Sequence, residues 1–402
     1  MPRLPAVLRP LYPRLKPAYV HATRVVAPAA VALSRFGGSY LPTGVVETME
    51  EAAATSGGHC VTARAPETIA RPPFLGYPQD LPPLEPATDT VVPRLAVAEL
   101  PGGRILGPHR AVITGAGDLL WELSLYFGTT HPRQHPLFLN PFPGPPHQVA
   151  GRLGVLASRG DRNYYHFLID VLPRLGVLAQ APDIEVPEQW YVPATSRFQL
   201  ELLDLMGITA DTRINSDEIE HVRADCLVVP GLASVVKEKN TPWMVEFLRQ
   251  RLLTEVPDAA SRRPVYITRT AGTNNRAVAN EPALISMLTE RGFDVVDPGA
   301  MSVAEQIRTF AGASVIVSPH GAALANLVFA SPGCTVIELF PPGCVLPDYW
   351  RLASSVPGVT YRYLSAWPDS STAQNRPMAI VSDIAVDLTA LGTMLDESTA
   401  TA

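Results

Sequence analysis

The sequence predicts an α/β protein with two doubly wound domains, in which helices cover both faces of a parallel sheet. Short β-branched runs alternate with helical patterns across residues 148–345. Most of these runs are apolar without alternation, as strands covered on both faces require. The chain has 402 residues, of which 47% are hydrophobic, and can therefore bury more than one core. We expect the two domains to meet near residue 258.

The clearest α/β unit spans residues 297–342. Ser302 and Glu305 form a capping box, and Gly312 follows the last apolar residue of the helical pattern, so a helix is predicted between them. The elements expected after it are buried strands at 314–317 and 335–340, with a short helix at about 324–328 between them.

A polar turn, Pro319-His320-Gly321, separates the first of these strands from the short helix. Backbone N–H groups at Gly321, Ala322 and Ala323 would then face outward at a helix N-terminus, which attracts anions. Asn326 lies one turn on and Glu338 near the end of the next strand, so three polar groups are expected around one helix mouth. The structural alternative is a turn histidine beside a strand-end charge.

A second block, YYHFLIDVLPRL, follows a predicted strand through Val155. Asn163, His166 and Asp170 stand at i, i+3 and i+7 and share one face of the predicted helix. These types suit a hydroxyl contact, a general base and its orienting carboxylate. The alternative is a helix N-cap, a half-buried histidine and a salt bridge from Asp170 to Arg174.

A third block runs from Val265 to Glu281. Arg269 stands at the carboxyl end of a predicted buried strand, and Arg276 lies in the loop before a helix that begins near Glu281. Two guanidinium groups on one such loop can hold phosphate through paired hydrogen bonds. They are equally compatible with surface charges.

These blocks together resemble glycosyltransferase family 61, which includes bacterial capsular-polysaccharide enzymes, plant xylosyltransferases and animal O-GlcNAc transferases. The segment SPHGAALANLVFASPGCTVIELFPP is similar to the C-terminal signature of the family, and the two earlier blocks occur in the order that the family requires. The resemblance covers residues 104–395. It implies a bacterial capsular-polysaccharide-type enzyme with a GT-B architecture: two Rossmann-like domains facing a cleft.

The resemblance also implies an inverting transfer of a sugar from a nucleotide-diphosphate donor to a glycan or lipid-linked acceptor. No DxD triplet occurs, which favours a mechanism with no obligatory metal or other cofactor. Two schemes remain open, with His166 as the base oriented by Asp170 or with the aspartate acting directly. The residues expected at the site are His166, Asp170 and Asn163 for catalysis, and Arg269, Arg276, Asn280, Glu281, His320, Gly321, Ala322, Asn326 and Glu338 for the donor, with Asn326 and Glu338 on its ribose or base.

The other segments are expected to serve these two domains. The predicted segments are a basic, Pro-rich leader and linker (1–93), an antiparallel β-meander cover (94–147), an acceptor domain (148–258), a nucleotide-sugar domain (259–345) and a C-terminal extension that packs back on the first domain (346–402). Residues 1–46 contain no acid, a pattern compatible with peripheral contact at an anionic membrane. Their prolines favour a flexible leader instead of one continuous helix.

Composition excludes several classes of protein. The net charge of −6 argues against broad nucleic-acid binding. The four cysteines form no CxxC pair, so neither a zinc site nor a disulfide framework is indicated, and a cytoplasmic location is the simplest expectation. A non-catalytic nucleotide-sugar or polysaccharide-binding protein remains an alternative. A nicotinamide oxidoreductase is disfavoured because no strand-linked GxGxxG motif is present.

Overall fold

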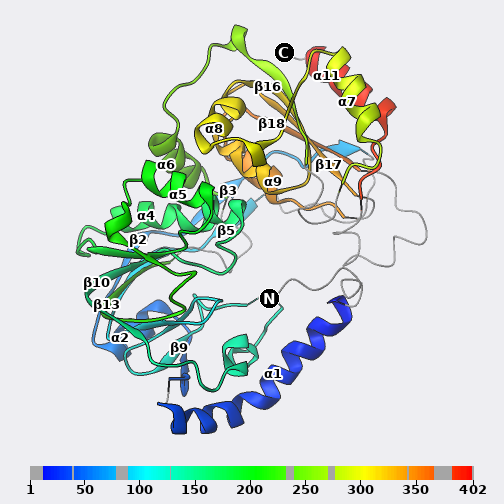
Figure 1. Ribbon diagram of the computed structural model, residues 1–402. Coiled ribbons are helices and arrows are strands. Elements are labelled where there is room, and N and C mark those ends of the chain that lie inside the picture. Colours follow the sequence, from blue (N-terminus) through cyan, green and yellow to red (C-terminus); the bar gives the residue numbers. More distant parts are fainter. Residues whose placement is uncertain are drawn as a thin grey trace. The chain divides into compact units, whose positions relative to one another are not determined.

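The computed structural model describes residues 12–38, 40–77, 89–126, 128–231, 240–269, 277–341, 344–365 and 383–400. It has a mixed α/β fold divided into two compact units (Figure 1). Unit 1 comprises Met1–Thr68 and Val91–Lys239, and unit 2 comprises Ile69–Thr90 and Asn240–Ala402. The expected boundary near residue 258 is therefore misplaced, because helix α6 (Pro242–Leu252) belongs to unit 2.

Unit 1 contains one ten-stranded mixed sheet. Its central strand, β13 (His221–Pro230), pairs in parallel with β10 (His147–Val155) on one side and antiparallel with both β6 (Leu95–Pro101) and β7 (Arg104–Leu106) on the other. The remaining strands are β1 (Gly44–Val46), β2 (Cys60–Arg64), β8 (Ala111–Ile113), β9 (Asp118–Leu120), β11 (Gln189–Val192) and β12 (Arg213–Asn215).

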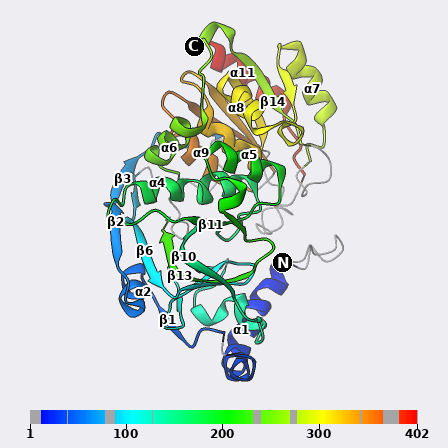
Figure 2. The ribbon, with the colours of Figure 1, turned by 60° about the vertical axis from the view of Figure 1, so that its left-hand side comes forward.

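The meander predicted at residues 104–125 is confirmed, since β7, β8 and β9 pair antiparallel. It is not a separate cover, however. Strand β13 is long enough for β6 and β7 to pair with successive parts of one edge, so the meander and the parallel strands share a sheet. Helices α2 (Met49–Ser56) and α4 (Pro173–Ala179) both pack against β6, from opposite faces (Figure 2).

Two predictions for the N-terminal region are wrong. The supposed linker at 47–93 contains α2, capped by Thr48, and four strands: β2, β3 (Glu67–Ala70), β4 (Gly76–Tyr77) and β5 (Asp89–Val92). Apart from β3 and β5, which pair with each other, these strands find their partners far along the chain, and no local periodicity reports such pairing.

The second wrong prediction concerns the prolines. Residues Tyr12–Ser34 form one helix, α1, with Pro17 and Pro28 inside it. Its buried stripe includes Val20, Ala27 and Ala30, so packing outweighs the lost backbone donors. In the described part of the chain no helix has the length and apolarity to cross a bilayer. Contact of α1 with a membrane surface stays a prediction.

Unit 2 contains a six-stranded sheet in which every strand runs parallel to its neighbours. The strand order is β15 (Asp294–Val296), β14 (Arg263–Ile267), β16 (Ala313–Pro319), β17 (Thr335–Phe340), β18 (Thr360–Ser365), β4. The chain goes from β14 outward to β15 and then returns to the other side of β14 to form β16. Ligands of open α/β sheets bind at the carboxyl ends of strands beside such a reversal.

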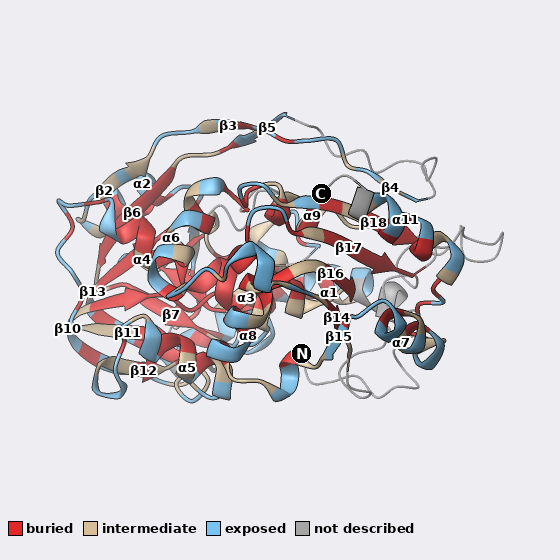
Figure 3. Cartoon of the chain, turned by 90° about the horizontal axis from the view of Figure 1, so that it is seen from above, coloured by how far each residue is buried: buried red, intermediate tan, exposed pale blue. Residues whose placement is uncertain are grey.

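Helices cover both faces of this sheet. On one face α7 (Glu281–Glu290) and α11 (Leu388–Ala400) share a core with alternate strand residues such as Ile337 and Leu339 (Figure 1). On the other, α8 (Val303–Ala311), the 3₁₀ helix η9 (Ala322–Phe329) and α9 (Asp348–Ala353) lie over the face of Phe340. Figure 3 shows β17 buried between these layers.

The predicted capping box of α8 is present, with Ser302 and Glu305 bonding reciprocally. The C-terminal extension differs from the prediction. Strand β18 belongs to the sheet of unit 2, and α11 packs on that sheet instead of on the first domain. The short helix after His320 is 3₁₀, and the Asn326 amide within it donates to the Ala323 carbonyl at 3.1 Å.

Unit 1 also holds three histidines that burial keeps neutral. Burial lowers the pKa of His135 to about 3, helped by His109 and Arg159. Burial also lowers the pKa of His109 to about 4, and neighbouring positive charges such as Arg159 reinforce it. The pKa of His221 falls to about 4 for the same first reason. In the unfolded chain each of these rings would titrate near 6.5.

We therefore predict that unit 1 loses stability as the pH falls from about 6.5 to about 4. In that window the unfolded chain binds protons that the folded rings do not, so each histidine contributes a slope of about 1.4 kcal/mol per pH unit. Urea unfolding at pH 7, 6 and 5 measures the slope. The slope of His135→Asn should be smaller than that of wild type by the contribution of about one proton. Comparing the two proteins removes the contribution of all other groups. An identical slope in both proteins would contradict the assignment.

Candidate active-site residues

The helical segment that carries His166 and Asp170 has an unusual middle turn. It begins as α3 (Tyr164–His166), continues as a π-turn, η5 (Phe167–Val171), and resumes as α4 at Pro173. Proline at 173 has no N–H, and the Leu172 N–H reaches back five residues to the Phe167 carbonyl at 3.2 Å. Such π-turns frequently occur at functional sites because they reorient one or two side chains.

The structure brings two of the three predicted catalytic residues into direct contact. His166 Nδ1 and Asp170 Oδ2 lie 2.7 Å apart across the π-turn. The Asp170 side chain is 5% exposed and that of His166 is 26% exposed, so the carboxylate is buried and the ring reaches solvent. With Nδ1 bound to the carboxylate, Nε2 is the ring nitrogen available for proton exchange.

Asn163 has a structural task that the alternative interpretation anticipated. It is the N-cap of α3, and its side-chain oxygen accepts from the Tyr165 N–H at 3.0 Å. The side chain therefore fixes the start of the helix that carries His166, and its role as a catalytic contact stays a prediction.

Gly160 constrains the imidazole from the other side. It has φ +89°, which side-chain-bearing residues rarely adopt, and a Cβ placed there would lie 3.0 Å from His166 Cδ2. The backbone of the 158–163 loop thus packs directly on the ring. A substituent at position 160 would push the imidazole away from its contact with Asp170.

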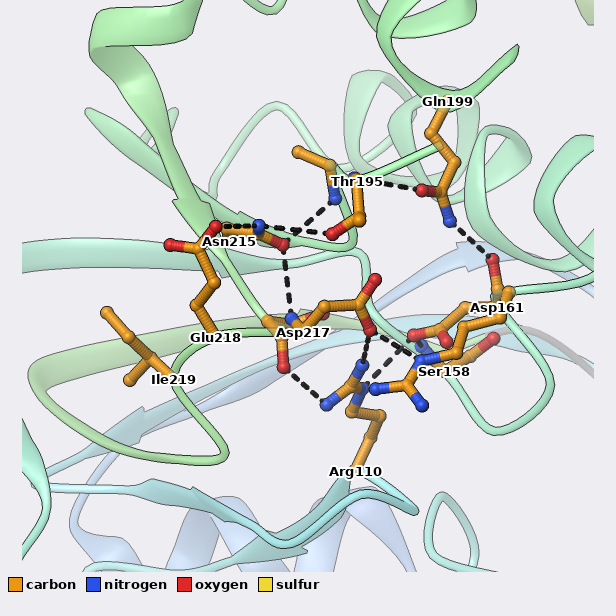
Figure 4. A network of polar contacts seen from close by, with 12 residues as sticks. Arg110, Ser158, Asp161, Thr195, Gln199, Asn215, Asp217, Glu218 and Ile219 are labelled. Atoms are coloured by element: carbon orange, nitrogen blue, oxygen red, sulfur yellow. Dashed lines mark hydrogen bonds and ion pairs between the residues drawn. The ribbon is translucent and has the colours of Figure 1, made fainter. Parts of the chain in front are cut away.

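A buried ion-pair cluster holds this loop in place (Figure 4). Arg110, only 2% exposed, lies between two carboxylates, with Nε 3.2 Å from Asp161 and one terminal nitrogen 2.9 Å from Asp217. The other terminal nitrogen donates to the Ser216 carbonyl at 2.6 Å. Asp161 also accepts from the Ser158 N–H at 3.2 Å, which closes the loop.

Two more arginines surround the dyad. Arg174 is buried, donates to the backbone carbonyl of Asp170 at 3.0 Å and to that of Pro230 at 2.8 Å, and burial lowers its pKa to about 10. Burial also lowers the pKa of Arg159, while the charge of Asp170 opposes this. Of these cluster residues only Arg174 was considered in the sequence. Arg110 lies far along the chain from the 158–163 loop, so no local pattern indicated their contact.

In unit 2 the structure brings together the two turns beside the strand reversal. Arg269 follows β14 and His320 follows β16, and the Arg269 guanidinium donates to the His320 carbonyl at 3.0 Å. A Cβ at Gly321 would lie 3.3 Å from the same guanidinium. Gly321 and Ala322 are partly exposed at the start of η9. A cation and a helix start therefore adjoin at the carboxyl edge of the sheet, as an anion site requires.

Glu338 is an orienting residue and not a surface contact. It is fully buried, with Oε1 2.5 Å from His320 Nδ1 and Oε2 accepting from the Tyr361 hydroxyl. Burial raises the pKa of this carboxyl, and His320 opposes the shift. The prediction that Glu338 meets the ribose or base is therefore wrong, because no solvent-facing surface of the side chain remains. It holds the imidazole of His320, which stacks on Phe340.

Three other predicted donor residues make internal contacts. Asn326 is fully buried and donates to the Gln306 side chain at 2.9 Å, so its predicted contact with the donor is wrong. Asn280 exchanges two hydrogen bonds with the backbone of Val386. Glu281 accepts from the hydroxyls of Tyr266 and Thr268. Arg276 lies outside the described residues.

Comparison with known proteins relates part of the chain to one family of enzymes. Residues 164–337 match the sequence model of the family described as Glycosyltransferase 61. The matched range contains His166, Asp170, Arg269 and His320, so this part of the chain is similar to the domain of that family.

Curated relatives of the chain are named as glycosyltransferases. The chain is 32% identical over 183 residues to protein O-linked-mannose beta-1,4-N-acetylglucosaminyltransferase 2 of Xenopus tropicalis, covering 44% of this chain and 27% of the relative. The Homo sapiens protein of the same name is 34% identical over 109 residues, covering 25% and 18%. The chain thus spans about a quarter or less of the length of these relatives.

We predict that Arg110→Met destabilises unit 1 by about 3–5 kcal/mol, because the buried Asp161 carboxylate loses its counter-charge, whereas Asp217 keeps its contact with Arg162. Arg197→Met is the matched control: Arg197 forms an exposed pair with Glu201 at 2.6 Å and should cost less than about 1 kcal/mol. Denaturant unfolding of the two variants measures the difference. Equally small losses of unfolding free energy in both variants would show that the buried cluster does not hold the loop.

Proposed function

We propose that the protein is an inverting glycosyltransferase of GT-B architecture. It moves a sugar from a nucleotide-diphosphate donor to a hydroxyl of a glycan or lipid-linked acceptor, in bacterial capsular or other cell-surface polysaccharide synthesis, at the cytoplasmic face of the membrane. The observation that carries the proposal is the His166–Asp170 contact at 2.7 Å within the range that matches family 61. The relatives are named as N-acetylglucosaminyltransferases, which supports a sugar donor of this kind.

In unit 1 the dyad supplies the base. Asp170 accepts the Nδ1 proton of His166, which leaves the Nε2 lone pair to take the proton of the acceptor hydroxyl. As the hydroxyl oxygen bonds to the anomeric carbon, the bond from that carbon to the diphosphate breaks, and a single displacement inverts the centre. The imidazolium that forms is stabilised by the Asp170 carboxylate. Gly160 and the capped start of α3 keep the ring in this orientation.

In unit 2 the turns after β14 and β16 supply the cradle for the leaving group. Arg269 provides a guanidinium, and the start of η9 provides the backbone amides of the partly exposed Gly321 and Ala322. The departing nucleoside diphosphate gains negative charge, which these groups stabilise without a metal ion. Glu338 and Tyr361 fix the imidazole of His320 beside them.

The donor is tested with a panel of nucleotide sugars, by hydrolysis and by calorimetric binding. We expect one nucleotide class to bind, and Arg269→Ala to weaken its binding by about 1.5–3 kcal/mol, the scale of a charge-assisted contact. Arg263→Ala is the control, since Arg263 is exposed at the opposite end of the same strand. Equal affinities of the two variants for the nucleotide sugar would contradict the assignment of Arg269. If wild type hydrolyses no nucleotide sugar of the panel, the result counts against a glycosyltransferase.

The dyad is tested by separating binding from transfer. If His166 is the base, His166→Ala should abolish transfer, with donor affinity within about twofold of wild type. Asp170→Asn should retain measurable turnover, because the imidazole remains and only its orientation and charge stabilisation weaken. A dead Asp170→Asn enzyme beside a merely slow His166→Ala enzyme would reverse the two roles. It would make the aspartate the direct base.

A further inference from the structure

Helix α1 has an outer face that is apolar, exposed and uncharged. Its inner face packs on the strands β7, β8 and β9 and on the 3₁₀ helix η4 (Pro136–Leu139), through buried residues such as Ala27 and Ala30. On the opposite side, apolar residues recur every three or four positions, so they share one face of the helix. This outer face consists of six exposed residues: Ala18, Ala22, Val25, Ala29, Leu33 and Phe36.

The larger side chains of the outer face are exposed to an unusual degree. Val25 is 65% exposed and Phe36 is 89% exposed. Phe36 lies in the 3₁₀ turn η2 (Arg35–Gly37), which directly continues α1. Among the residues that the structure describes, Phe36 and Phe142 are the only exposed phenylalanines, and Phe142 follows η4, the element that packs against α1. Apolar side chains that gather in water in this way mark a surface that meets a partner.

Positive charges line one flank of the outer face. Arg24 and Arg35 are both exposed, and they stand about three helical turns apart, so they lie on the same side of α1. Two acids, Glu218 and Glu220, line a cavity together with Tyr19 of α1. Tyr19 lies on the flank away from both arginines, because its spacing from them is not a whole number of turns. The outer face is therefore apolar, with one positive edge.

The charge of the chain is unevenly distributed around α1. The whole chain has a net charge of −6, and residues 1–46 contribute +6 because they contain six arginine and lysine residues and no acid. The other residues therefore carry −12. Residues 123–160, which include η4, also contain no acid. A positive region on an otherwise acidic protein is attracted to an anionic surface.

These features distinguish between the possible partners of the outer face. An anionic membrane accepts an apolar helix face at the boundary between headgroups and acyl chains, and its phosphates attract the arginines at the edge of that face. A second copy of the chain would bring two positive N-terminal regions together, which their repulsion opposes. A nucleic acid would attract the arginines but would leave Leu33 and Phe36 in water. The membrane is the partner that satisfies both parts of the surface.

We propose that the outer face of α1 docks on an anionic phospholipid membrane. The helix lies along the surface, with Val25, Leu33 and Phe36 among the lipids and with Arg24 and Arg35 at the phosphates. Helix α1 precedes residues 164–337, the part of the chain that is similar to family 61, so this surface lies outside the family match. The inference does not depend on the proposed reaction, because docking would hold unit 1 at the membrane whatever chemistry it performs.

The apolar contribution is tested with a pair of serine substitutions. Leu33→Ser combined with Phe36→Ser, the serine pair, removes the two side chains at the end of the outer face. Leu205→Ser combined with Val186→Ser is the matched control elsewhere in unit 1, because Leu33 and Leu205 are both 47% exposed and Val186 is also exposed. All four side chains are exposed, so the core is untouched, and melting curves confirm that the variants are folded.

The electrostatic contribution is tested with a pair of glutamine substitutions. Arg24→Gln combined with Arg35→Gln, the glutamine pair, removes the positive edge of the outer face. Arg197→Gln combined with Arg223→Gln is the control, because both are exposed arginines of unit 1 outside α1. The control changes the net charge of the chain by the same amount, so any difference between the two reports the position of the charge.

Binding of the full chain to lipid vesicles is measured by co-sedimentation. The vesicles contain phosphatidylcholine alone or phosphatidylcholine with phosphatidylglycerol. We expect wild type to bind the anionic vesicles, with an affinity that falls as salt is added. The serine pair should bind at least about tenfold more weakly, because its apolar contact is lost. The glutamine pair should lose about fivefold for each arginine, and both controls should bind as wild type does.

The place of contact is measured with an inserted tryptophan. In Phe36→Trp the new indole should enter the bilayer, so vesicles of brominated lipid should quench its fluorescence. Val186→Trp is the control, and its added fluorescence should not be quenched. This readout requires that the outer face itself meets the lipid, and binding through another surface would not produce it.

The inference is overturned if wild type does not bind anionic vesicles, if the serine and glutamine pairs bind as their controls do, or if the tryptophan at position 36 is not quenched. A dimer in the absence of lipid that the serine pair dissociates would assign the outer face to a second copy of the chain, and it would also overturn the inference. Nucleotide-sugar hydrolysis in solution is measured in parallel. Hydrolysis without vesicle binding refutes the docking surface alone, whereas vesicle binding without hydrolysis of any donor counts only against the transferase.

Discussion

The buried guanidinium of Arg110 is the constraint on which the site in unit 1 depends. A cation removed from water is tolerated only when carboxylates are held at fixed positions around it, here Asp161 and Asp217. Arg110 itself has φ +57°, a conformation that few non-glycine residues adopt. The cost of that strain and of the buried charges is offset when the 158–163 loop takes one conformation. The position of His166 follows from that loop.

The fold of unit 2 could be predicted more completely than that of unit 1, and the reason is locality. In residues 297–342 each element is encoded by its own neighbours, as with Ser302 and Glu305 at the start of α8. The sheet of unit 1 depends on pairings between distant segments, such as β1 with β9 and β2 with β6. Periodicity within a short window carries no information about such partners. The prolines of α1 led to a wrong prediction for a similar reason, because the segments that pack against this helix lie about a hundred residues further along the chain.

The same distinction separates the site residues that could be predicted from those that could not. His166 and Asp170 are four residues apart on one helical segment, so their contact follows from spacing. Glu338 was placed at the donor because its strand end was known, whereas its burial is set by Tyr361 on the next strand. Arg110 gave no signal in the sequence, because its partners Asp161 and Asp217 lie about fifty and a hundred residues further along the chain.

Strand β4 has a consequence for how such an enzyme can be divided. It adds to the edge of β18, and Arg71, just before it, donates to the Asn240 carbonyl at 2.7 Å and to the Ser355 hydroxyl at 3.1 Å. Unit 2 therefore takes an early excursion of the chain as part of its own fold. A fragment that starts at residue 240 would leave the β18 edge bare and prone to aggregation. Recombination between relatives can exchange this unit intact only when residues 69–90 travel with it.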